Sequence, residues 1–85
     1  MDSALTAVVV DDNPRSRETL TRALAQAGVA VSLSCGTSVQ DFRRVVEAAP
    51  SLIFVTLEDP LPRAIRAVDY LSGSLPDTPI VAVST

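Results

Sequence analysis

Two adjacent acidic residues, Asp11 and Asp12, directly follow the apolar run at residues 5–10 and have the side chains that metal chemistry needs. In proteins Mg²⁺ is usually held by one or two carboxylates together with several waters, so such a pair can form a weak cation site. A structural interpretation is also open, in which Asp12 or Asn13 caps the next helix and Asp11 is solvated. The pair alone favours this structural interpretation. We therefore expect no resident cofactor and at most weak Mg²⁺ binding at Asp11 and Asp12.

The lack of His and Lys, and the presence of a single cysteine, exclude several kinds of site. Zinc sites, intrachain disulfides and catalytic triads built on an imidazole need residues that this sequence does not contain. Cys35 is interpreted as a small core residue. All seven basic residues are Arg and the net charge is −3, which argues against nucleic-acid binding by phosphate neutralisation.

The N-terminal segment does not have the composition of a targeting signal. It carries acidic residues where a secretory signal carries basic ones, and no apolar stretch approaches the ~20 residues that span a bilayer. We expect a cytoplasmic protein without membrane insertion.

Apolar runs alternate with amphipathic segments along the 85 residues, which is the length of one small domain. The continuous runs at 5–10, 52–57 and 79–83 predict strands buried on both faces. Residues 29–35 alternate between apolar and polar and predict a strand at a sheet edge. Helices are predicted at 14–27, 38–49 and 60–72. The resulting β-α-β-α-β-α-β order predicts a doubly wound, parallel α/β sheet.

Each predicted helix has an expected buried stripe and an expected N-terminal cap. The stripes are Leu20, Ala23, Leu24 and Ala27 in the first helix, Val39, Phe42, Val46 and Ala49 in the second, and Ala64, Ile65, Val68 and Leu71 in the third. The expected caps are Asn13, a capping box of Thr37 with Gln40, and Asp59.

The remaining polar residues of interest follow the other strands. Ligands of open parallel sheets lie at the carboxyl ends of strands. Besides the acidic pair, this rule selects Thr56, Glu58 and Asp59 after the third strand, and Ser84 and Thr85 after the fourth.

Three stretches resemble the receiver domain of response regulators, which has a CheY-like fold. AVVVDDNPRSRETLTRAL is similar to its first strand, acidic pair and first helix; PSLIFVTLEDP is similar to the strand that carries the phosphoacceptor aspartate; and LPDTPIVAVST is similar to the approach to its phosphate-sensing Ser or Thr. The similarity stays in register over all 85 residues. It implies the strand order 2-1-3-4, with Asp11 and Asp12 as the acidic pair and Ser84 as the switch hydroxyl.

The sequence departs from the receiver pattern at the position that carries the chemistry. Thr56 stands four residues before Pro60, where the resemblance places the phosphoacceptor aspartate. A threonine hydroxyl is neutral and weakly nucleophilic without an adjacent base, so we expect no phosphoacceptor and no enzymatic activity. Glu58 and Asp59 are expected to lie too far along the loop to replace it. The family's fifth strand, fifth helix and conserved Lys are also missing, so we expect the N-terminal part of a longer receiver or protein.

These features predict an interaction module rather than a phosphotransfer domain. Receiver-like domains without a phosphoacceptor resemble the N-terminal domains of the CpaE/TadZ-type ATPases of Flp pilus assembly, which implies a role in dimerisation or localisation. The alternative is a working two-component receiver, which keeps the acidic pair and the switch hydroxyl. A flavodoxin-like nucleotide binder is disfavoured because the first turn, DDNPRS, is acidic and has no glycine.

A protein partner is expected, and we predict that it is a second copy of the chain. The order 2-1-3-4 leaves the uncharged run 79–83 at an open sheet edge, whose unpaired backbone groups favour pairing with another chain. The predicted interface residues are Ile65, Val68, Tyr70, Val81 and Val83.

Overall fold

The computed structural model describes residues 5–57 and 61–84, without the side chain of Leu61. In chain order the elements are β1 (Thr6–Val10), α1 (Pro14–Gln26), β2 (Ala30–Cys35), α2 (Val39–Ala48), β3 (Leu52–Leu57), α3 (Leu61–Ser74) and β4 (Ile80–Ser84). Every strand and helix predicted from the sequence is present, with each boundary within two residues of its predicted place. None of the described helices is long and apolar enough to cross a membrane.

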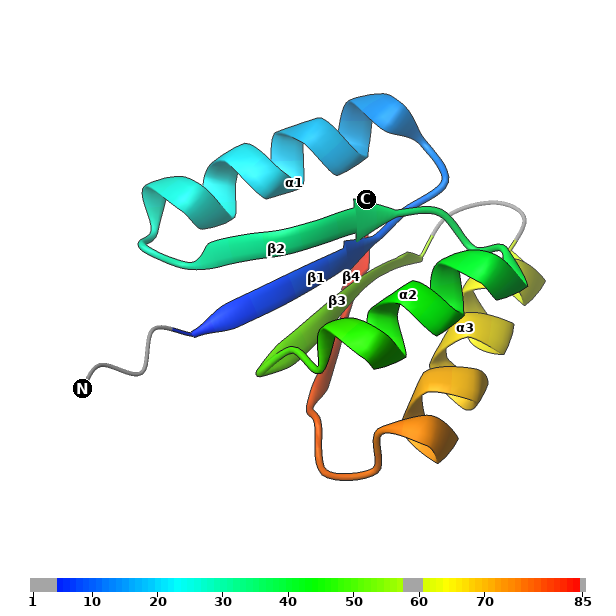
Figure 1. Cartoon of the computed structure of the whole chain (residues 1–85). Coiled ribbons are helices and arrows are strands. Elements are labelled where there is room, and N and C mark those ends of the chain that lie inside the picture. The colour runs from blue at the N-terminus through cyan, green and yellow to red at the C-terminus, as the bar shows by residue number, and fades with distance from the viewer. Residues whose placement is uncertain (1–4, 58–60, 85) are drawn as a thin grey trace.

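The four described strands form one parallel sheet in the order β2-β1-β3-β4, as predicted (Figure 1). β1 and β3 lie in the middle because their continuous apolar runs can be buried on both faces. β2 lies at an edge, and its side chains alternate between exposed and more buried, as expected. The pairing of β1 with β2 contains a register shift between Ala7 and Val8, whereas β3 and β4 pair regularly from Ile53–Ile80 to Leu57–Ser84.

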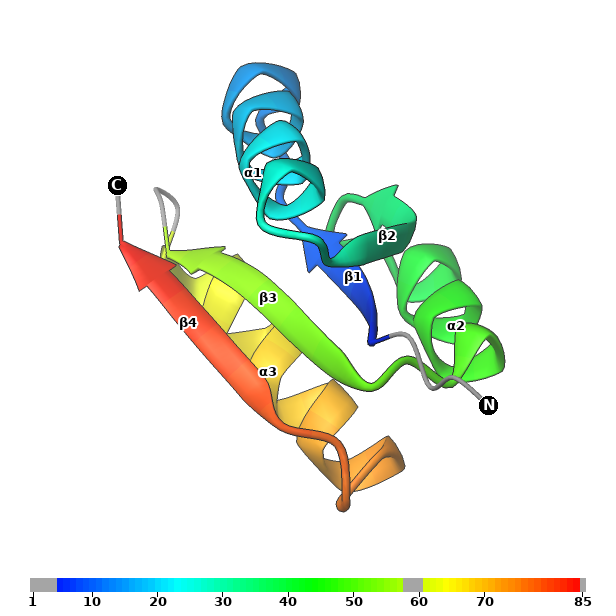
Figure 2. The ribbon, with the colours of Figure 1, turned by 90° about the vertical axis from the view of Figure 1, so that its left-hand side faces the viewer.

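The helices cover the two faces of this sheet unequally. α2 and α3 lie on one face and α1 on the other, as Figure 2 shows. The buried cluster lies between the sheet and the α2–α3 pair, and its members are Val8, Val10, Cys35, Phe42, Val45, Ile53, Val55, Ala64, Ala67 and Leu71. Alternation along the strands therefore turns Phe54 and Thr56 of β3, and Val81 and Val83 of β4, toward the α1 face.

On the α1 face, the helix packs over β1 and β2 but leaves β3 and β4 partly uncovered. None of the α1 residues, all of them described, is fully buried, and of the predicted stripe only Leu20 and Leu24 are half-buried. The prediction for Ala23 and Ala27 was wrong because both are exposed. A groove of about 540 Å³ separates α1 from the β3–β4 half of the sheet, and Leu20, Thr56 and Val83 are among the residues that line it.

Two further stripe predictions were partly wrong, because each helix packs a narrower face than its periodicity predicted. α2 buries Phe42 and Val45, while Val39 is 58% exposed. Ala49 is also exposed, since it ends α2 in the left-handed conformation (φ 44°). In α3, Ala67 takes the place predicted for Ile65, which is 51% exposed.

The helix caps were predicted with mixed success. Asn13 caps α1 by accepting a hydrogen bond from the Arg15 N–H (2.9 Å). The capping box of α2 joins Ser38 with Asp41 instead of Thr37 with Gln40. The predicted cap Asp59 lies outside the described residues.

Candidate functional site

Asp11 is buried at the end of β1, with 1% of its surface exposed. Its Oδ1 accepts a hydrogen bond from the Asn13 N–H (2.8 Å) and its Oδ2 accepts one from the Ser16 hydroxyl (2.6 Å). Its own N–H donates to the Cys35 carbonyl (2.8 Å). A buried carboxylate needs such donors because each lost hydrogen bond to water must be replaced. Asp11 therefore ties the start of α1 to the sheet.

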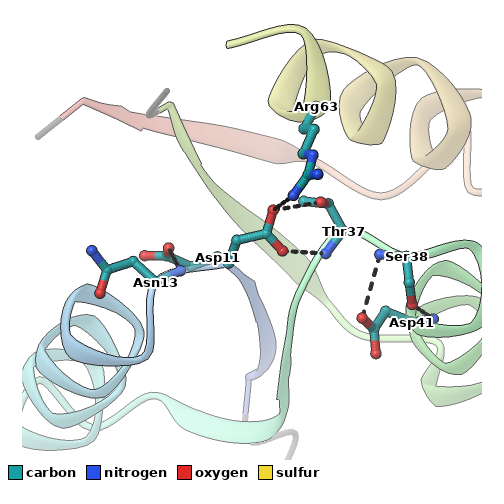
Figure 3. Close-up of polar contacts among 7 residues, drawn as sticks. Asp11, Asn13, Thr37, Ser38, Asp41 and Arg63 are labelled. Atoms are coloured by element: carbon teal, nitrogen blue, oxygen red, sulfur yellow. Dashed lines mark hydrogen bonds and ion pairs between the residues drawn. The ribbon is translucent and has the colours of Figure 1, made fainter. Parts of the chain in front are cut away.

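Asp12 points to the other side of the β1 end, toward α2 and α3 (Figure 3). Its Oδ1 accepts from the Thr37 N–H (2.9 Å) and its Oδ2 accepts from the Thr37 hydroxyl (2.7 Å). The Arg63 guanidinium of α3 lies 3.6 Å from Oδ2. Partial burial acts to raise the pKa of Asp12, but the Thr37 hydrogen bonds and the Arg63 charge outweigh it and hold the pKa below its ordinary value of 3.8. We call Asp12, Thr37 and Arg63 the Asp12 clamp.

The chain between β2 and α2 is shaped to fit against this clamp. A Cβ at Gly36 would stand 2.7 Å from Asp12 Oδ1, closer than any real carbon–oxygen contact of this kind. The next residues form the capping box, in which the Ser38 hydroxyl accepts from the Asp41 N–H (3.0 Å) and Asp41 Oδ2 accepts from the Ser38 N–H (3.4 Å). Gly36 thus lets the loop approach Asp12 closely enough for Thr37 to donate both hydrogen bonds.

Thr56 lies near the carboxyl end of β3 and is 6% exposed. Its preceding residue, Val55, pairs with Val10, so Thr56 lies beside Asp11 across the two central strands. The hydroxyl side chain faces the α1 groove, which Asn13 and Ser16 also line. Because the sequence contains no His and no Lys, neither of these side chains is available to activate the hydroxyl.

Ser84, the predicted switch hydroxyl, lies at the end of β4, where it pairs with Leu57 and is exposed. Glu58, Asp59 and Thr85 fall outside the described residues. The structure thus brings the ends of β1, β3 and β4 to one edge of the sheet, as the predicted parallel order required.

The described residues do not form a ready-made Mg²⁺ site. Within 5–57 and 61–84, no three His, Cys, Asp or Glu side chains gather closely enough to hold a metal ion. Asp11 and Asp12 direct their oxygens at separate sets of protein donors, and the Arg63 cation already stands beside Asp12. Mg²⁺ prefers near-octahedral coordination with several waters, for which these engaged oxygens are poorly arranged. Weak Mg²⁺ binding stays a prediction.

The five predicted interface residues do not lie on one surface. Val81 and Val83 belong to the α1 face of the sheet, whereas Ile65, Val68 and Tyr70 belong to α3 on the opposite face. Val68 is half-buried against the core, and the Tyr70 ring packs on Phe42 with centroids 5.1 Å apart. Ile65 and Val81, at 51% and 39%, are the more accessible members of the two groups.

Sequence reasoning did not find Ser16, Gly36, Thr37 in its actual role, or Arg63. Ser16 carries a recoverable signal, because a Ser in the first turn of a helix after an acidic pair can donate to the first acid. Arg63 carries none, since nothing local marks which arginine of α3 meets Asp12.

Comparison with solved structures supports the fold. The chain is similar to the berylloflouride-activated NtrC receiver domain, with a TM-score of 0.59 and 15% sequence identity, over 99% of this chain and 84% of that domain. At this identity the likeness shows the fold, which confirms the predicted receiver-like architecture. No protein-family model and no curated protein matches the chain.

Proposed function

We propose that this chain is a receiver-like protein-interaction module that does not undergo aspartyl phosphorylation. The observation that carries the proposal is Thr56, buried near the end of β3 beside Asp11. An aspartate there would be ionised, would ligate a metal and would attack a phosphoryl donor, whereas a threonine hydroxyl is neutral and needs a base. The module therefore acts through its surface rather than through a covalent intermediate.

The acidic pair supports the same proposal. In a phosphorylating site the carboxylates must turn their oxygens to a shared cation. Here Asp11 binds the start of α1, and Asp12 binds Thr37 beside the Arg63 charge. Both acids have structural roles that hold loops at the sheet edge.

The kind of interaction we propose is dimerisation or localisation in the cytoplasm, with a homodimer as the first assembly. The support is the sequence resemblance to phosphoacceptor-less receivers of the CpaE/TadZ type, which suggests a part in pilus assembly. The exposed Val81 and the uncovered β3–β4 face supply apolar surface that such a contact needs.

A working two-component receiver is the second candidate. It is favoured by one observation, the retention of the acidic pair at the end of β1 with Ser84 at the end of β4. It requires an acceptor other than Thr56.

Incubation with acetyl phosphate and Mg²⁺, followed by intact-mass measurement, tests the proposal. We expect no mass gain from the wild-type chain, while a receiver domain with an aspartate acceptor gains one phosphoryl group under the same conditions. A stoichiometric, hydroxylamine-sensitive gain in the wild-type chain would refute the proposal and favour the second candidate.

A further inference from the structure

Within the described residues the sheet ends at two edge strands, β2 and β4, and they are protected to different degrees. β2 carries the register shift opposite Ala7 and Val8, and both α1 and α2 pack against it. Bulges and flanking helices are devices that keep an edge from pairing with another chain. β4 pairs regularly with β3 at all five positions, and its residues Ile80–Ser84 include no charge and no proline. β4 is therefore the edge that is open to a further strand.

The pattern of hydrogen bonds shows which backbone groups of β4 face outward. The Ile53 N–H donates to the Pro79 carbonyl (3.0 Å). In a parallel ladder the residues of one strand alternate between bonding to the neighbour and pointing away from it. Val81 and Val83 therefore bond to β3, and the N–H and C=O groups of Ile80, Ala82 and Ser84 point to the open side.

We propose that two copies of the chain pair through β4 in antiparallel orientation, with Ala82 on the two-fold axis. This inference rests on the proposed function as an interaction module and names the occupant of the edge. With Ala82 opposite Ala82 of the second copy, the outward groups match themselves: the two Ala82 residues exchange both hydrogen bonds, and each Ile80 does so with the opposite Ser84. The two sheets then form one continuous sheet.

The side chains fit the same register. Val81 falls opposite Val83 of the second copy, as a non-hydrogen-bonded pair, which is the position where cross-strand side chains lie closest. Both valines face the α1 side, where Val81 is 39% exposed and Val83 lines the groove. Pairing therefore joins the uncovered apolar strips of the two copies. Since β4 carries no charge, no like-charge repulsion opposes its meeting with itself.

A cysteine at Ala82 tests the position of the axis. Hydrogen-bonded antiparallel pairs have Cα atoms about 5.5 Å apart, which lies within the range that a disulfide spans. Under mild oxidation the full chain carrying Ala82→Cys should become mostly covalent dimer on non-reducing gels at micromolar concentration. Ser34→Cys is the matched control, since it places an exposed cysteine on the other edge strand and should stay monomeric on the gel. The native Cys35 is 3% exposed and present in both variants.

The register is tested with Val81→Cys and Val83→Cys. Each variant alone should cross-link poorly, because residues two places out of register lie about 7–8 Å apart, beyond disulfide reach. A mixture of the two variants should cross-link at least about fivefold more than either alone. Equal cross-linking of the three samples, or stronger cross-linking of Ser34→Cys than of Ala82→Cys, would overturn the proposed pairing.

Sedimentation of the uncross-linked chain completes the test. We expect a dimer whose dissociation constant rises by about tenfold or more in Ala82→Arg, because like charges then face each other across the axis. A monomer at all micromolar concentrations refutes the β4 pairing but leaves the absence of phosphorylation untouched. A mass gain with acetyl phosphate refutes the proposed function whatever the oligomeric state, so the two failures are distinguishable.

Discussion

Replacing Gly36 with alanine should destabilise the domain by pushing Asp12 away from Thr37. The new Cβ would stand 2.7 Å from Asp12 Oδ1, and the carboxylate must move because the other side of the contact is backbone. Since both oxygens belong to one rigid group, the movement weakens the hydrogen bonds from the Thr37 N–H and from the Thr37 hydroxyl together.

The expected size follows from two opposed effects. Two hydrogen bonds at about 1 kcal/mol each give an upper value near 2 kcal/mol, which we discount to about 1–2 kcal/mol because the Asp12 side chain is 40% exposed and water can replace the lost donors. Against this, Gly→Ala at a position without a positive φ stabilises by about 0.4–1 kcal/mol through the unfolded chain. The net loss in free energy of unfolding should be about 0.5–1.5 kcal/mol.

A double-mutant cycle with Asp12→Ala isolates the contact. Without the carboxylate, Gly36→Ala should be neutral or stabilising, so the coupling between the two positions should be about 1–2 kcal/mol. Urea unfolding followed by far-ultraviolet circular dichroism measures all four proteins of the cycle. If Gly36→Ala lowers stability equally in both backgrounds, Asp12 is not what the loop must approach, and the reasoning about the clamp fails.

Three further predictions concern single groups. Because the pKa of Asp12 is lowered in the folded state, its contribution to stability is present above its ordinary value of 3.8 and is lost as the pH falls through the folded pKa; Asp12→Asn should flatten this part of the pH dependence of urea unfolding between about pH 5 and pH 2. Burial raises the pKa of the Cys35 thiol to about 11, so its reaction with iodoacetamide at about pH 8 should be slow in the native state and at least about tenfold faster in urea; equal rates would contradict the burial. Thr56→Asp adds a carboxylate at a site only 6% exposed, beside Asp11, and should lower the thermal midpoint without metal and regain part of it with millimolar Mg²⁺; a midpoint that does not respond to Mg²⁺ would show that the engaged acids cannot join it.

The sheet could be predicted from sequence because its information is local to each strand. The apolar runs that became β1 and β3 have no polar face to expose, so they had to lie in the middle. The alternation of Val31, Leu33 and Cys35 with exposed neighbours fixed β2 at an edge. Parallel order then brought Asp11 and Thr56 side by side with no further information.

The Asp12 clamp could not be predicted because it depends on contacts between distant segments. Thr37 and Ser38 both have side chains that cap helices, and local rules cannot choose between them. The choice is made by Asp12, 25 residues away from Thr37, which takes both of the donors that Thr37 offers. Ile65 shows the same limit, since helical periodicity marks an apolar face but not how much of it a neighbour covers.

The weak attachment of α1 to the sheet has a consequence for how the domain opens. α1 is held by half-buried side chains such as Leu20 and Leu24, while the core cluster lies on the far side of the sheet. Its amides should therefore exchange with solvent through a local opening of lower free energy than the one that exposes β1 and β3. Such an opening would uncover Ala7 and Val9 from the α1 side and leave the α2–α3 layer folded. Native-state hydrogen exchange should accordingly resolve two cooperative units, with the plane of the sheet as the boundary between them.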